Sequence, residues 1–287
     1  MNIKIEKAHE LGFCFGVKRA IKLIEEASRK KRGIATLGPV VHNRFVVDKL
    51  AGLGVIPVTA LSDIKNGCVV ISSHGISPRL LSQIENRQLE VIDTTCPTVR
   101  KAQNAAKKLA EEGFTVVVFG EADHPEVKGL LGWAGEKAIA TKDEATLAHL
   151  TLCKRLGILS QTTQGNKQFA HFVKEVVDTV LPEIEEIRII NTICDETKKR
   201  QEAAVELARR SDLMLVIGGR NSANTKRLAE LSSPIVATYL IENAAEIRKS
   251  WIKGKKHIGI TAGTSTPDEA ISEVIETLNK LLPHDVI

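Results

Sequence analysis

The sequence predicts an α/β protein made of three similar units with mostly parallel sheets in a pseudo-threefold arrangement. Short apolar strands alternate with amphipathic helices along the whole chain, as in right-handed βαβ units. The same corner, an apolar run that ends at a cysteine just before a helix, occurs three times, at Cys14, Cys96 and Cys194. We expect α/β units over residues 1–95, 96–193 and 194–287, the last with a C-terminal helix and tail.

The composition is that of an ordinary globular protein, with 43% hydrophobic and 26% charged residues in 287. Aromatic residues make up only 3%, so the core is expected to consist of Ile, Leu, Val and Ala. The net charge of +5 comes without a basic block, which argues against nucleic-acid binding. The N-terminus lacks the apolar region of a signal peptide, and no apolar run approaches the ~18 residues of a membrane span. We therefore expect a cytoplasmic protein.

In the first unit, four apolar residues after Cys14 lie on one face of a helix that Gly33 ends; they are Val17, Ala20, Ile21 and Ile24. Strands are expected at 34–37, 55–58, 68–72 and 91–95, and further helices at 46–51 and 78–86. The second unit should contain helices at 99–109 and 167–179, with strands at 115–119, 137–141, 155–160 and 188–193. The third should contain strands at 213–217, 235–240 and 257–261, and helices through 204–208, before Leu231 and over 267–282.

Polar loop residues recur at nearly fixed distances from the cysteines. His42, His124 and Ser222 each lie 28 residues after one of the three cysteines, and His74, Thr162 and Ser265 lie 60, 66 and 71 residues after them. A repeated period of this kind indicates repeated structural units. The loops follow the carboxyl ends of parallel strands, where ligands bind in such sheets. If the units pack about a pseudo-threefold axis, the cysteines converge beside a polar pocket.

The three corner cysteines are candidate metal ligands. A helix N-terminus favours the thiolate, which is the form that binds metal. Three ligands without a fourth leave one coordination position open, as in catalytic sites. Thiolates select zinc or iron–sulfur clusters, and the spacing alone leaves both open. The simpler alternative is three unrelated core cysteines, and small buried side chains are what we expect of Cys68 and Cys153.

Other loop residues suggest anion binding and proton transfer. His42 and His74 are candidates to bind an anionic group, and Ser222, Asn224 and Ser265 are candidate neutral donors. The loop AGTSTP before a helix is a candidate anion nest, although the sequence lacks a complete P-loop motif; the alternative is ordinary capping and turn chemistry.

Glu126 is the candidate proton donor, with Thr162 as a relay. The alternative for Glu126 is a capping carboxylate at a helix start.

The motifs GFCFGV, VVHNR, SSHGIS, DTTCP, HPEVKG, SQTT, ICDETKKRQE, GGRNSANTKRL and TAGTSTPD, in this order, resemble the 4-hydroxy-3-methylbut-2-enyl diphosphate reductase (IspH/LytB) family over essentially the whole chain. The resemblance implies a central 4Fe-4S cluster, one per chain, held by Cys14, Cys96 and Cys194, with the fourth iron open to substrate. It also implies two-electron, two-proton removal of the hydroxyl of (E)-4-hydroxy-3-methylbut-2-enyl diphosphate. The products would be isopentenyl and dimethylallyl diphosphates of the methylerythritol phosphate isoprenoid pathway.

By the same resemblance, the substrate-binding residues are His42, His74, His124, Thr162, Ser222, Ala223, Asn224 and Ser265. His124 and Thr162 would lie near the substrate's hydroxyl, and Glu126 would supply the proton. Ala223 stands where family members often carry serine, so only its backbone N–H is expected to take part.

A ferredoxin or flavodoxin-type electron donor and a monomeric state complete the expectation. The alternatives are a three-cysteine zinc hydrolase of a phosphorylated metabolite and an iron–sulfur sensor. The sensor would need a nucleic-acid-binding element, and the sequence contains no recognisable one.

Overall fold

The computed structural model describes residues 3–65, 67–149 and 154–281, so the interpretation of Cys153 lies outside the described residues. The chain forms two compact bodies. We call the described parts of residues 1–18, 41–49 and 195–287 the terminal body, and those of residues 19–40 and 50–194 the central body.

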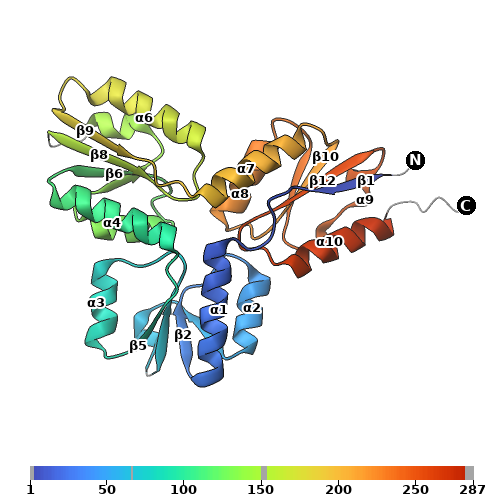
Figure 1. Cartoon of the computed structure of the whole chain (residues 1–287), viewed down its shortest axis with the longest axis horizontal. Coiled ribbons are helices and arrows are strands. Elements are labelled where there is room, and N and C mark those ends of the chain that lie inside the picture. Colours follow the sequence, from blue (N-terminus) through green and yellow to red (C-terminus); the bar gives the residue numbers. More distant parts are fainter. Residues whose placement is uncertain (1–2, 66, 150–153, 282–287) are drawn as a thin grey trace, which may run out of the picture. The chain divides into compact units, whose positions relative to one another are not determined.

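The central body contains two parallel four-stranded sheets (Figure 1). The first has the order β3-β2-β4-β5 and consists of β2 (Ile34–Leu37), β3 (Val55–Val58), β4 (Cys68–Ile71) and β5 (Glu90–Asp93). The second has the order β7-β6-β8-β9 and consists of β6 (Thr115–Phe119), β7 (Ile139–Thr141), β8 (Arg155–Ser160) and β9 (Glu186–Ile190). The helices of this body are α3 (Pro78–Asn86), α4 (Pro97–Glu111), α5 (Pro125–Ala134) and α6 (Asn166–Val180), with short 3₁₀ turns η1 (Leu61–Asp63) and η2 (Glu144–His149). Two more helices, α1 (Phe15–Lys30) and α2 (Arg44–Gly52), have residues in both bodies.

The terminal body contains one parallel sheet of the order β1-β12-β10-β11. Its strands are β1 (Lys4–Lys7), β10 (Leu213–Ile217), β11 (Thr238–Ile241) and β12 (His257–Ala262). Its helices are α7 (Asp195–Ala208), α8 (Ala223–Ser232), α9 (Lys249–Ile252) and α10 (Asp268–Leu281), with the turn η3 (Ala244–Glu246). The N-terminal strand β1 runs along β12 in this sheet, which Figure 1 shows in blue and red.

The predicted α/β class with parallel sheets is confirmed. The observed bounds of β2, β3, β6, β8 and β10 are those predicted. The predicted apolar stripe of α4, from Val99 to Leu109, is buried. The core of the terminal body, around Leu215 and Ile260, and one core of the central body, around Ile158 and Val176, consist mainly of aliphatic side chains, as the scarcity of aromatic residues predicts. The pseudo-threefold arrangement and the three unit boundaries stay predictions.

One strand was not predicted. β1 has the sequence KIEK and pairs in parallel with β12, from Lys4 opposite His257 to Lys7 opposite Ile260. Its alternating charges suit an edge strand but give little apolar signal. Because of this pairing, the sheet formed by the end of the chain takes its fourth strand from the beginning.

The three sheets share one arrangement that positions the site. In each sheet an edge strand (β1, β5 or β9) precedes a corner cysteine, Cys14, Cys96 or Cys194. The neighbouring strand (β12, β4 or β8) leads into the loop that carries Ser265, His74 or Thr162. Parallel neighbours end at the same edge of a sheet, so each cysteine corner is paired with one polar loop.

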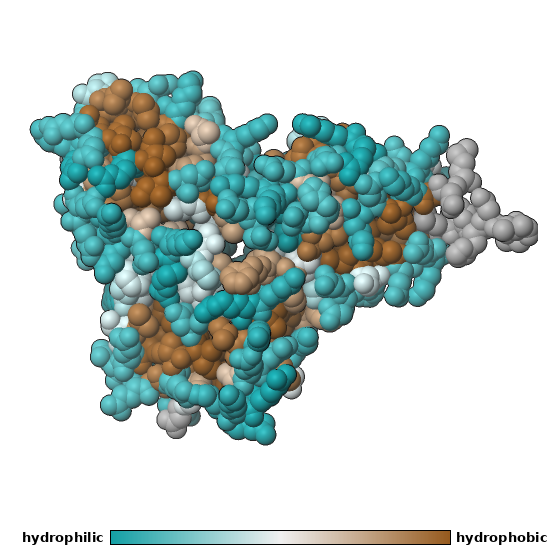
Figure 2. Space-filling view, in the orientation of Figure 1, coloured by the Kyte–Doolittle hydropathy of each residue, from teal (hydrophilic) through white to brown (hydrophobic). Residues whose placement is uncertain are grey.

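Hydrophilic residues cover most of the face shown in Figure 2. Among the described residues, no helix combines the length and the apolar content needed to cross a membrane.

Candidate active site

Each corner cysteine is hydrogen-bonded through its backbone to the polar loop of its own sheet. Cys14 N donates to Thr264 O at 3.1 Å in the terminal body. In the central body, Cys96 N donates to Ser73 O and Cys194 N donates to Thr162 O, both at 3.0 Å. The carbonyls belong to, or directly precede, the predicted residues Ser265, His74 and Thr162. Three copies of one hydrogen bond support the repeat that the sequence predicts.

Two of the predicted ligands lie at the start of the same helix. Cys96 is the N-cap of α4, with Pro97 at its first position. The Sγ of Cys194 lies 3.9 Å from the Oγ1 of Thr98, in the first turn of α4. The unsatisfied N–H groups and the positive dipole end of a helix N-terminus stabilise thiolates, so this corner favours the form of cysteine that binds metal.

Cys14 directly precedes α1, as predicted. All three corner cysteines are half-buried thiols outside any disulfide, whereas Cys68 is buried in β4, where its Sγ lies 3.1 Å from Glu90 Oε2. Soft sulfur ligands bind zinc and iron–sulfur clusters, so these accessible thiols at helix starts fit either of them. The predicted meeting of all three involves both bodies and stays a prediction.

The predicted anion-binding residues of the terminal body include buried polar atoms that need partners. Asn224 is only 2% exposed, and neither its Oδ1 nor its Nδ2 has a hydrogen-bond partner among the described residues. The same holds for Ser265 Oγ at 5% exposure. Buried side-chain polar atoms are nearly always satisfied in folded proteins. These orphaned groups are therefore expected to meet a ligand.

Ser222 and Ala223 begin α8. Ser222 is its N-cap, and its Oγ accepts from Thr225 N at 3.3 Å, so its hydroxyl hydrogen remains able to donate. Ala223 is the first helical residue, where a backbone N–H has no partner within the helix. The start of α8 thus offers two donors toward an anion.

His42 is held close to the glycine pair before α8. A Cβ on Gly219 would lie 2.2 Å from His42 O, so only glycine allows this approach. Burial lowers the pKa of His42, and the charge of Lys226 lowers it further. His42 is thus predominantly a neutral imidazole at pH 7, which could donate a hydrogen bond to an anion but carries no charge.

Glu126 is a buried acid in the central body, paired with Thr162 as predicted. It is 1% exposed, and its carboxylate accepts from Thr162 N at 2.6 Å and from Thr162 Oγ1 at 2.9 Å. Burial raises its pKa to about 7, against the two hydrogen bonds from Thr162, which lower it. Thr162 O in turn accepts from Cys194 N. Glu126 can therefore hold or release a proton near neutral pH. It is linked through Thr162, by hydrogen bonds, to the corner of Cys194.

His74 and His124 lie together beside this acid. Their rings make an edge contact with centroids 5.3 Å apart. His124 is the N-cap of α5, and its Nδ1 accepts from Glu126 N at 3.1 Å, which places the proton of a neutral ring on Nε2. His74 Nδ1 lies 3.5 Å from Ser72 Oγ. Four candidate site residues, His74, His124, Glu126 and Thr162, thus lie within one body.

Sequence reasoning missed Arg200. It lies in TKKRQ, a run that looks like solvated surface charge, yet its side chain is 1% exposed. Its Nη1 donates to Glu10 O at 3.3 Å and to Ala262 O at 3.1 Å. The missed signal is the period of α7, in which Arg200 falls on the same face as the buried Ala203, Ala204 and Leu207.

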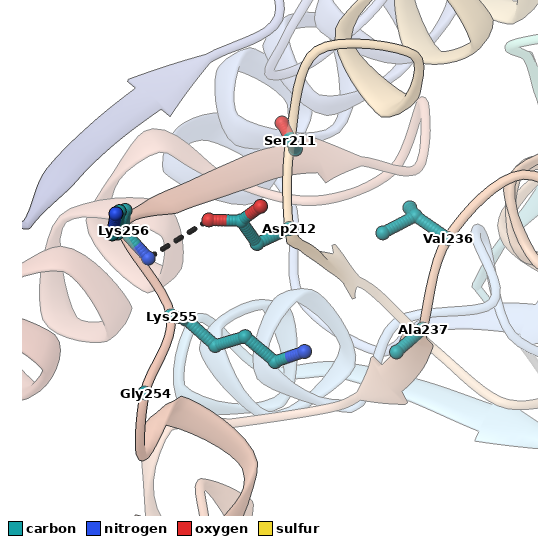
Figure 3. Close-up of a pocket in the computed structure, with 7 residues that line it drawn as sticks. All are labelled: Ser211, Asp212, Val236, Ala237, Gly254, Lys255 and Lys256. Atoms are coloured by element: carbon teal, nitrogen blue, oxygen red, sulfur yellow. Dashed lines mark hydrogen bonds between the residues drawn. The ribbon is translucent and has the colours of Figure 1, made fainter.

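A pocket of about 570 Å³ in the terminal body lies away from these residues (Figure 3). Its lining residues precede the strands β10, β11 and β12, whereas the site loops follow them. Figure 3 shows Asp212 accepting from the backbone of Lys256, at 2.8 Å, and this bond together with one from His257 lowers the pKa of Asp212. The pocket is therefore not part of the candidate site.

Fold and site together define an α/β protein with cysteine corners, a buried acid and buried polar atoms that lack partners among the described residues, at the carboxyl ends of its parallel strands. The chain belongs to the LytB protein family, whose family model matches residues 5–279. The predicted resemblance is thus confirmed.

Curated relatives match along nearly their whole length. A protein of Dehalococcoides mccartyi (strain CBDB1) is 48% identical over 97% of this chain and 99% of its own, and one of Geobacter sulfurreducens is 46% identical over 97% and 98%. Both are named 4-hydroxy-3-methylbut-2-enyl diphosphate reductase.

Two solved structures of reductases of this kind are also similar. One, described as the terminal enzyme of the non-mevalonate pathway, has a TM-score of 0.71 and 40% identity over 97% of this chain and 99% of that one. The other, from Plasmodium falciparum, has a TM-score of 0.91 and 28% identity over 99% and 90%.

Proposed function

We propose that this chain reduces (E)-4-hydroxy-3-methylbut-2-enyl diphosphate to isopentenyl and dimethylallyl diphosphates. Two electrons and two protons remove the allylic hydroxyl as water. Family membership and the relatives named for this reaction support the proposal. It rests most on one observation within the chain itself, the buried carboxyl of Glu126 bonded to Thr162, whose carbonyl accepts from Cys194.

Glu126 and Thr162 perform the proton transfer in this proposal. A pKa of about 7 leaves a large fraction of Glu126 protonated at neutral pH, which suits a general acid. Thr162 Oγ1, at 2.9 Å from Glu126 Oε2, can pass the proton on by exchanging its own. His124 accepts from Glu126 N through Nδ1, so in the proposal the Nε2 side of its ring is the one that faces the substrate's hydroxyl.

The diphosphate is bound in the proposal mainly by the terminal body. Asn224 and Ser265 supply buried donors that have no other partner among the described residues, and Ser222, Ala223 N and neutral His42 add further donors. His74 of the central body is proposed to join them. Binding energy from the diphosphate, which does not react, orients the allylic carbon for the chemical step.

We further propose that Cys14, Cys96 and Cys194 hold a 4Fe-4S cluster with one iron open to substrate. The half-buried thiols at helix starts support this assignment. When bound, the cluster would supply a Lewis acid for the substrate's oxygen and a store for electrons. A ferredoxin or flavodoxin-type protein is the proposed donor of those electrons. A monomeric, cytoplasmic protein remains our prediction.

Anaerobic purification followed by metal analysis and electron paramagnetic resonance, with and without the allylic diphosphate, tests the proposal. We expect about four irons per chain on the 4Fe-4S assignment, and a spectrum that changes when the substrate is added. Zinc without iron would instead support the hydrolase, and a cluster spectrum indifferent to the diphosphate would support the sensor.

A further inference from the structure

The buried guanidinium of Arg200 belongs to none of the groups that bind or protonate the substrate in the proposed reaction. Arg200 is among the largest fully buried side chains in the described part of the chain. Its Nη1 bonds two backbone carbonyls, Glu10 O and Ala262 O, and its Nε has no partner among the described residues. In the part of the chain that the structure describes, no carboxylate forms an ion pair with it, unlike the exposed Arg210, which pairs with Glu6 and Glu206.

A buried cation without an ion-paired carboxylate is costly, and this one remains charged because arginine does not lose its proton in proteins. Burial lowers the pKa of Arg200, and negative charge at Cys14, Glu10 and Glu196 acts in the opposite direction. Arg200 therefore stands in the field of a predicted cluster ligand, within the same body.

The two carbonyls also show what Arg200 connects. Glu10 lies four residues before Cys14, and Ala262 lies three residues before Ser265. The hydrogen bond from Cys14 N to Thr264 O joins the same two segments. One side chain thus fixes the segment carrying a predicted cluster ligand against the loop carrying a predicted diphosphate donor.

We propose that Arg200 is a positioning residue and the internal counter-charge for the cluster at Cys14, holding the Cys14 and Ser265 segments together and favouring the reduced cluster. The inference rests on the proposed function. Reduction adds negative charge to a cluster already bound by thiolates. A buried positive charge bonded to the segment that carries Cys14 stabilises the reduced form more than the oxidised form.

The test compares three variants of the cluster-loaded protein in a redox titration followed by electron paramagnetic resonance. Arg200→Met keeps the side-chain bulk and removes the charge, Arg200→Lys keeps the charge and loses the fork, and Arg209→Met removes one charge from the exposed residue just after α7. An opposite charge at a buried site shifts such equilibria by one to three powers of ten. We expect Arg200→Met to make reduction about tenfold less favourable, equivalent to about 59 mV more negative for one electron.

Arg200→Lys should keep the midpoint potential near that of the wild type, while its KM rises because the clamp is lost. Arg209→Met should change neither quantity, because an exposed charge is screened. If Arg200→Met does not fold, Arg200→Gln makes the same change of charge. A loaded Met or Gln variant with the potential of Arg209→Met would overturn the inference alone, whereas a wild-type protein that binds no cluster would overturn the proposed function.

Discussion

The two bodies carry opposite kinds of site chemistry. The terminal body has neutral donors at Asn224 and Ser265 and a buried cation at Arg200. The central body has a buried acid at Glu126. Neutral donors and a cation suit an anion, and a carboxyl with a raised pKa suits proton transfer. In the proposed function, one body therefore serves mainly to bind and the other to protonate.

Two glutamates show why the bodies differ. Glu126 has neutral partners and full burial, and its pKa rises to about 7. Glu6 in the terminal body accepts hydrogen bonds from Arg210 and Lys4. These bonds, above all the one from Arg210, lower its pKa to about 2. Glu6 thus stays ionised and structural, whereas Glu126 can exchange a proton at neutral pH.

The largest effect is expected from the corner cysteines. Replacing Cys14, Cys96 or Cys194 by serine should abolish cluster absorption and turnover, since a serine hydroxyl is a poor substitute for a thiolate. Iron analysis and the visible spectrum measure the loss. Cys68→Ser, in β4 of the central body, is the control and should keep both. Full iron content and turnover in a corner variant would remove that residue from the site.

Glu126→Gln tests the protonating side. It should keep the cluster and substrate binding but lower kcat by ~10² or more, the scale of a lost general acid. Stopped-flow and steady-state assays with a chemical reductant separate the chemical step from electron delivery. Glu121→Gln, five residues earlier in the loop that precedes α5, is the matched control. A kcat equal to that of the control would refute the role of Glu126.

The pH dependence of stability tests the raised pKa of Glu126. Because its pKa is about 7 in the folded state and 4.5 ordinarily, its contribution to stability is fully present below pH 4.5 and is lost as the pH rises through 7. The loss should be about 3 kcal/mol, an order-of-magnitude figure. Urea unfolding of the wild type and Glu126→Gln at several pH values measures it. Parallel curves for the two proteins would contradict the raised pKa.

Asn224→Ala tests the binding side and should have the smallest effect. Loss of one buried hydrogen-bonding group to an anion should lower kcat/KM about tenfold, while the cluster spectrum without substrate stays unchanged. Asn243→Ala, which removes the exposed cap of η3 in the same body, is the control. Equal diphosphate affinity in the two variants would show that Asn224 faces no ligand.

The sequence by itself determined the local features of this protein. Helical stripes, short apolar strands and glycine stops depend on neighbours within a few residues, so Val99 to Leu109 and strands such as β10 follow from the pattern. Repetition of the cysteine corners then indicated three sheets, and the motifs indicated the family.

Only the tertiary structure decided which distant groups meet. It placed the unpredicted β1 beside β12, brought Thr162 onto Glu126 across 36 residues and buried Arg200, which the sequence presents among lysines. The sequence could suggest a proton donor at Glu126, but desolvation raised its pKa, and desolvation depends on packing from every side. Periodicity records how a segment faces its core, whereas pairing and burial depend on what the rest of the chain places against it.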